Sequence, residues 1–131
     1  MMNILLITIG GALGTLGRYA SSEFILKLLR GTNCANFPWH TLVINVVGSL
    51  LAGILYYFAV HNFNQFDPKL KNFLLIGFLG GFTTFSSFSL DFFRLFTAGH
   101  EALAFTYAFA SVSLALLFVF FGFYLMKIIF I

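Results

Sequence analysis

The chain has 131 residues, of which 60% are hydrophobic and only 8% are charged. Because an ordinary soluble domain carries about a quarter charged residues, this composition argues against a soluble enzyme, a nucleic-acid-binding domain and a disordered segment. The net charge of +3 comes from scattered basic residues that form no basic stripe, and a single cysteine, Cys34, cannot form an internal disulfide or a thiolate metal cage. The chain is therefore interpreted as a small integral membrane protein.

Four apolar blocks follow one another along the chain. A membrane-spanning helix needs about 20 apolar residues, and the blocks cover approximately residues 3–29, 39–60, 72–96 and 101–127. The first block has no basic residue ahead of it, so we expect a retained span rather than a cleaved signal. The blocks are continuously apolar without the alternation of a β-barrel. The sequence predicts an all-α membrane protein with one transmembrane domain, residues 1–131.

The basic residues beside the spans favour neither orientation in the membrane. With four spans, both termini lie on the same side as the loop between the second and third spans. The basic residues of that side and of the opposite side are Lys69, Lys71 and Lys127 against Arg30, Arg94 and, if the first span ends early, Lys27. Because the numbers of basic residues on the two sides are nearly equal, the sequence favours dual topology, in which copies insert in both directions and form an antiparallel homodimer. The alternative is a single orientation set by another feature.

The third block contains the densest group of small and hydroxylated residues. Gly80 and Gly81 are poor helix formers, and five hydroxyl residues follow them: Thr83, Thr84, Ser86, Ser87 and Ser89. We therefore expect a broken third helix here. Non-helical backbone at membrane depth occurs only inside protein or beside a water-filled cavity, so the break should lie in one of these settings. Carbonyls freed at such a break are candidate cation ligands. The alternative is close helix packing through Gly77 and Gly81, which form a GxxxG pair.

Helical spacing sorts the residues after these glycines into two stripes. The first is polar and consists of Thr84, Ser87, Asp91 and Arg94. The second is aromatic and consists of Phe85, Phe88, Phe92 and Phe96. Aromatic ring edges carry partial positive charge, so rings beside hydroxyls suit a small, partly dehydrated anion, although a lipid-facing or core stripe is the alternative. We expect Asp91 to face a vestibule or to pair with Arg94 at the helix end.

The second and fourth blocks add uncharged hydrogen-bond donors. Asn45 shares a helical face with Thr41 and Ser49, and its amide either bonds helices together or lines a pathway. Tyr107 and Ser111 share a face of the fourth block, where hydroxyls either line a pathway or bond back to their own helix. We find no deep carboxylate pair, histidine cluster or lysine, as proton coupling or covalent catalysis would require. This lining suits a small anion that passes without chemistry.

Three segments, residues 10–19, 41–49 and 77–89, resemble the Fluc family of microbial fluoride channels. The resemblance extends over the whole chain and is most specific in the third segment, GFLGGFTTFSSFS. It implies an antiparallel, dual-topology homodimer in the bacterial plasma membrane, with two fluoride pores built from both copies. It also implies passive export of fluoride and hence fluoride resistance.

The resemblance further implies roles for individual residues. Those on the fluoride pathway and its vestibule are Asn45, Phe85, Phe88, Tyr107, Ser111, Thr41, Ser86, Ser87 and Asp91. Arg18 matches an arginine of the family's first helix and is expected to attract anions at the pore entrance. The backbone carbonyls of Gly80 and Thr83 are implied to hold a structural sodium ion at the dimer interface, and no organic cofactor is implied. Ala115 stands where a further hydroxyl is expected.

Two other functions are compatible with four apolar spans. The first is a small, dual-topology, proton-coupled multidrug exporter, which depends on an intramembrane carboxylate, and Glu23 is the candidate in the first span. The second is a membrane assembly subunit that transports nothing.

Overall fold

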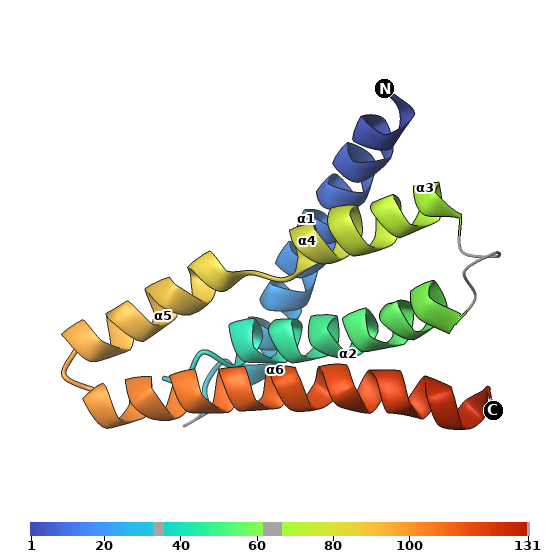
Figure 1. Ribbon diagram of the computed structural model, residues 1–131. Coiled ribbons are helices and arrows are strands. Elements are labelled where there is room, and N and C mark those ends of the chain that lie inside the picture. The colour runs from blue at the N-terminus through green and yellow to red at the C-terminus, as the bar shows by residue number, and fades with distance from the viewer. Residues whose placement is uncertain (33–35, 62–66, 131) are drawn as a thin grey trace.

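The computed structural model describes residues 1–32, 36–61 and 67–130, and these residues form helices joined by short connections (Figure 1). The first two long helices are α1 (Met2–Leu29) and α2 (Trp39–His61). The third hydrophobic block consists of α3 (Pro68–Lys71), the π-helical segment η1 (Asn72–Leu79), α4 (Gly80–Phe82) and α5 (Phe85–Thr97). The last helix is α6 (Glu101–Ile129). Cys34 and residues 62–66 lie outside the described residues.

Four helical stretches are long and apolar enough to cross a membrane: residues 2–29, 39–61, 68–97 and 101–129. This confirms the prediction of an all-helical protein with four spans. The third stretch begins before the predicted residue 72 because Asp67 caps it, with Oδ1 accepting a hydrogen bond of 2.8 Å from the Lys69 amide. Pro68 occupies the first helical position, where its missing N–H costs nothing.

Helices α2 and α6 lie side by side along much of their length (Figure 1). Two glycines allow this close approach. A Cβ on Gly53 would lie 3.0 Å from the Phe123 amide nitrogen, and one on Gly122 would lie 3.2 Å from the Ile54 amide nitrogen. Backbones in such direct contact are typical of small-residue packing between membrane helices. Gly53, which shares a helical face with Asn45, therefore packs against α6.

Helix α1 crosses the first half of the third span in the same manner. A Cβ on Gly77 would lie 3.0 Å from the Gly10 Cα, and one on Gly81 would lie 3.1 Å from the Gly11 Cα. The GxxxG pair of the third span is therefore in close helix contact. The second half of that span, α5, packs against α6 instead.

The backbone between α4 and α5 is extended at two residues (Figure 1). Thr83 has φ −82° and ψ 158°, and Thr84 has φ −152° and ψ 120°. Gly80 is helical, with φ −61° and ψ −36°, so the extended residues follow the glycines that the sequence identified as weak helix formers. Thr84 then caps α5, because its Oγ1 accepts a hydrogen bond of 3.2 Å from the Ser87 amide.

Candidate functional site

Asn45 on α2 holds the extended segment of the third span. Its Nδ2 donates to the Thr84 carbonyl oxygen at 3.0 Å, and its Oδ1 accepts from the Thr84 amide at 2.9 Å. One neutral side chain thus satisfies both backbone groups of a residue that has no helical partners. Such groups cost about 1–3 kcal/mol each when they are left unpaired away from water. Asn45 therefore bonds two elements together, which is one of the two roles expected for it.

The amide of Asn45 also contributes to the wall of a cavity of about 470 Å³, here called the central cavity. Its polar lining residues are Asn45, Ser49, Thr83, Thr84 and Ser111, and its aromatic ones are Phe85 and Phe88. The two phenylalanine rings lie 5.4 Å apart between centroids. Ala115 also lines this cavity. Residues of α2, α5 and α6 that helical spacing had grouped on separate faces therefore line one cavity, which combines hydroxyls, an amide and aromatic rings.

Ser111 contributes an unusual group to the central cavity. The residue is only 6% exposed, and its Oγ has no hydrogen-bond partner among the described residues. Helical hydroxyls often bond back to their own helix, as Thr106 does to the Ala102 carbonyl at 2.8 Å. A buried hydroxyl without a partner is costly, so Ser111 would gain from a hydrogen-bond acceptor that enters the cavity it lines.

A second cavity, of about 350 Å³, lies between α1, α2 and α5 and is here called the vestibule. The predicted site residues that line it are Arg18, Thr41, Ser87 and Asp91, together with Arg94 of the polar stripe. Thr84 lines both the vestibule and the central cavity. The two cavities therefore adjoin at the extended segment.

Asp91 carries the vestibule's buried carboxylate and is 8% exposed. Its Oδ2 accepts a hydrogen bond of 2.6 Å from Thr41 Oγ1 and one of 3.5 Å from the Tyr107 hydroxyl. Its Oδ1 lies 3.9 Å from Arg94 Nη1. The two roles expected for Asp91 were alternatives, and the structure combines them, since Asp91 lines the vestibule and also pairs with Arg94.

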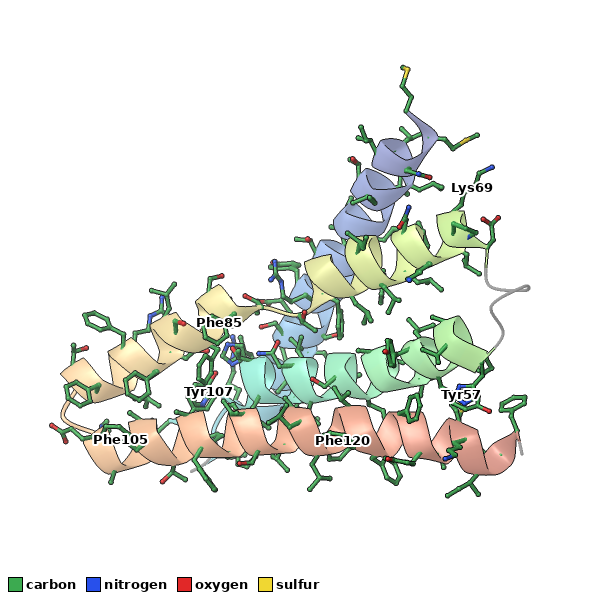
Figure 2. The ribbon with its side chains drawn as sticks, viewed as in Figure 1. Tyr57, Lys69, Phe85, Phe105, Tyr107 and Phe120 are labelled. Carbon is green, nitrogen blue, oxygen red and sulfur yellow. The ribbon has the colours of Figure 1, made fainter. Side chains whose placement is uncertain are left out.

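Tyr107 and Ser111 do not line one continuous surface. Tyr107 is completely buried, donates to Asp91 and packs against Phe88 in a tilted arrangement, with 5.4 Å between ring centroids. Figure 2 shows Tyr107 on α6 and Phe85 at the start of α5. Tyr107 therefore supports the vestibule carboxylate, whereas Ser111 lines the central cavity. A face deduced from spacing on one helix does not reveal which neighbouring element each member meets.

One expected vestibule residue lies outside both cavities, and one unexpected residue lines the vestibule. Ser86 is exposed and is not among the lining residues of the central cavity or the vestibule, and its Oγ lies 3.2 Å from Thr84 Oγ1. His40 also lines the vestibule, although it was not among the expected site residues. Its position next to Thr41 was the only signal for this in the sequence.

The carbonyls of Gly80 and Thr83 lose their helical donors at the extended segment. The Thr84 amide, four residues after Gly80, donates to Asn45, and the Ser87 amide, four residues after Thr83, donates to Thr84 Oγ1. Gly80 is exposed, and a Cβ there would meet no described atom within 4 Å. Unwound backbone carbonyls of this kind are suitable ligands for Na⁺. The described residues contain no cluster of three or more histidine, cysteine or acidic side chains for a metal ion.

Comparison with known proteins agrees with these features. A family model described as "CrcB-like protein, Camphor Resistance (CrcB)" matches residues 5–123. Three relatives carry the name fluoride-specific ion channel FluC. Those of Rhizobium etli and Rhizobium meliloti are 40% and 42% identical to this chain, and each alignment covers 97% of this chain and 98% of the relative. That of Coxiella burnetii is 44% identical over 88% of this chain and 90% of the relative.

Proposed function

The chain belongs to the CrcB-like family, and on this basis we propose that it is a fluoride-selective channel of the bacterial plasma membrane. It lets intracellular fluoride leave passively, down its electrochemical gradient, and so protects the cell. Three relatives with 40–44% identity are named as fluoride-specific channels. The four apolar spans suit a multi-pass membrane protein.

Within the structure, the observation that best supports this proposal is the buried, unpaired hydroxyl of Ser111, a residue that lines the central cavity. An ion cannot cross the bilayer unless its hydration shell is replaced. Fluoride is a small anion that accepts strong hydrogen bonds, so a free O–H donor and ring edges replace water with partners of the correct polarity. A passive pore must also release its ion, and several weak neutral sites in sequence permit this.

The order of the cavities suggests the path of the ion. Arg18 attracts fluoride to the vestibule, where Thr41 and Ser87 are also lining residues. Thr84 belongs to both cavities and connects the vestibule to the central cavity. Fluoride then passes Phe85, Phe88 and Ser111 without a change in covalent bonding. The interruption of the third helix is part of this path, because it places Thr84 between the two cavities.

The working unit is an antiparallel, dual-topology homodimer with two pores. Four helices scarcely enclose a path, and Phe85, a pathway residue, is 77% exposed in one copy. A second copy packed against this face would complete the wall. The nearly equal numbers of basic residues on the two sides of the membrane support insertion in both directions.

A structural sodium ion at the dimer interface fits the residues that are present. The carbonyl oxygens of Gly80 and Thr83 have lost their helical donors, and Gly80 lies beside open space at an exposed surface. Two copies meeting there would contribute four such oxygens to one ion. A bound cation would supply positive charge at these carbonyl oxygens, while the chain's own side chains bind the fluoride.

The proton-coupled multidrug exporter is less well supported. Glu23, its candidate carboxylate, is exposed on α1 and does not line the central cavity or the vestibule. If transport of an organic cation required protons and were abolished by Glu23→Gln, the exporter would be the better assignment. A protein that carries no ion flux after reconstitution would instead fit an assembly subunit.

Fluoride efflux from liposomes containing the purified protein tests the proposal. We expect wild-type protein to release fluoride and retain chloride, and equal chloride flux would refute the claim of selectivity. Phe85→Ile removes an aromatic ring from the lining of the central cavity, so we expect slower fluoride efflux. Phe109→Ile is the matched control, since both rings are 77% exposed, and it should leave efflux unchanged.

Two further measurements address the pathway and the assembly. Asn45→Asp replaces a neutral donor of the central cavity with a group that repels anions when ionised, so we expect fluoride efflux to fall sharply. Chemical cross-linking should capture antiparallel pairs in the membrane. A monomeric protein, or a parallel pair with Asn45 and Phe85 facing lipid, would contradict the proposed channel.

A further inference from the structure

A third cavity, of about 520 Å³, adjoins the vestibule on the side toward the start of α2, and is here called the outer hollow. The charged and titratable residues that line it are Arg30, His40, Asp91 and Arg94. Three of these, His40, Asp91 and Arg94, also line the vestibule. The outer hollow, the vestibule and the central cavity therefore form a series in which each adjoins the next through shared residues.

A carboxylate at the junction of the outer hollow and the vestibule is unfavourable for an approaching anion. The Oδ2 atom of Asp91 is occupied by the hydroxyls of Thr41 and Tyr107. These neutral donors leave the negative charge in place. The other oxygen, Oδ1, faces Arg94 Nη1 at 3.9 Å. An anion can pass this junction only if the local positive charge outweighs that of Asp91.

Arg94 is placed to provide that charge. Its side chain is 76% exposed, so an ion pair with Asp91 contributes little to stability. Its guanidinium nevertheless belongs to the wall common to both cavities. The basic side chains that line one or both cavities from neighbouring elements are Arg18 of α1, Arg30 just after α1, and His40 of α2. With Arg18 and Arg94 against Asp91, the junction has a net positive charge, and low-dielectric walls concentrate such a field.

We propose that Arg94 is an anion-attracting residue of the conduction path, which collects small inorganic anions in the outer hollow and delivers them to the vestibule. For this chain the anion is fluoride, so the inference rests on the proposed function. Arg94 acts through its charge on ions that are still hydrated, and it does so before selection occurs in the central cavity. It therefore affects how often ions arrive and leaves the choice between fluoride and chloride unchanged.

Ionic strength separates this electrostatic role from a structural one. Initial fluoride efflux is measured at subsaturating fluoride with the same impermeant salt on both sides of the liposome membrane. The Debye length, over which the field of a charge decays, is about 30 Å at 0.01 M and about 3 Å at 1 M. We expect Arg94→Gln to slow efflux about three- to tenfold at about 0.01 M, near the lower end of known steering effects. At 1 M the variant and wild type should be equal.

Two variants control for structure and for overall charge. Arg94→Lys keeps the charge without the planar guanidinium, so it should retain wild-type efflux at both salt concentrations. Lys127→Gln removes an exposed charge in the last turn of α6 that lines neither the vestibule nor the outer hollow, and it should also match wild type. The fluoride-to-chloride ratio should be the same in all variants.

The outcomes are distinguishable. If wild-type protein conducts and Arg94→Gln equals it at low salt, or stays slower at high salt, the role of Arg94 in attracting anions is refuted while the channel assignment stands. If Arg94→Lys is as slow as Arg94→Gln, charge is not the cause and the inference is likewise wrong. If wild-type protein itself carries no fluoride, the proposed function fails.

Discussion

The hydrogen bonds between Asn45 and Thr84 allow a quantitative prediction of how much Asn45 contributes to the free energy of unfolding. Asn45→Leu keeps a side chain of similar size but removes both the donor to the Thr84 carbonyl oxygen, at 3.0 Å, and the acceptor for the Thr84 amide, at 2.9 Å. Thr84 is half-buried in a chain that crosses the membrane. Its two backbone groups would then have lost their partners, with little water available to replace them.

The structure sets the size of the effect. Each orphaned group costs about 1–3 kcal/mol, so two of them should lower the free energy of unfolding by about 2–6 kcal/mol. Asn45→Asp keeps an acceptor for the Thr84 amide and loses the donor, so it should lie between Asn45→Leu and wild type. Asn72→Leu, the same substitution at the start of η1, is the control and should change stability by less than about 0.5 kcal/mol, as an ordinary substitution away from such features does.

Titration with a denaturing detergent, followed by circular dichroism, measures these differences in unfolding. Fluoride efflux measured on the same preparations shows whether the loss of the hydrogen bonds also impairs conduction. We expect Asn45→Leu to be both less stable and slower. If Asn45→Leu matched Asn72→Leu in stability, the extended segment would not depend on this side chain, and the reasoning from hydrogen bonds would be refuted.

Three further predictions concern other parts of the molecule. Ser111→Ala removes the unpaired donor of the central cavity. It should slow fluoride efflux about tenfold or more, since a hydrogen bond to a charged group is worth about 1.5–3 kcal/mol. Ser113 is an exposed neighbour on the same helix, so Ser113→Ala should have no effect. Gly14→Ala places a Cβ 2.8 Å from a backbone nitrogen of α4 and should lower the folded yield, whereas Gly11→Ala meets its nearest described atom at 3.8 Å and should be tolerated. Thr41→Val removes the 2.6 Å hydrogen bond to the vestibule carboxylate, which should slow efflux without changing the fluoride-to-chloride ratio, and a changed ratio would contradict a role confined to the vestibule.

Hydropathy predicted the four helices because spans in a membrane are long and nearly free of charge, and few competing structures share that pattern. Helical spacing also identified the shared face of Asn45 and Ser49, and both residues line the central cavity. The period of a helix determines which residues share a face regardless of what that face contacts. These parts of the site could therefore be predicted from the sequence.

Features that depend on two elements could not be predicted in this way. The extended residues are Thr83 and Thr84 rather than the glycines before them, since Asn45 on another helix supplies their hydrogen bonds. The π-helical form of η1 has no signature in the sequence that we recognise. Tyr107 donates to Asp91 across two helices, and only tertiary structure reveals that contact.

The two halves of the third span belong to different neighbours, since η1 and α4 pack on α1 while α5 packs on α6. Close glycine contacts hold the first half against α1. Any displacement of this pair relative to the pair of α5 and α6 would therefore have to change the dihedral angles of Thr83 and Thr84. Two hydrogen bonds from Asn45 on α2 restrain the Thr84 backbone. The rigidity of the path at this point therefore depends on one side-chain amide.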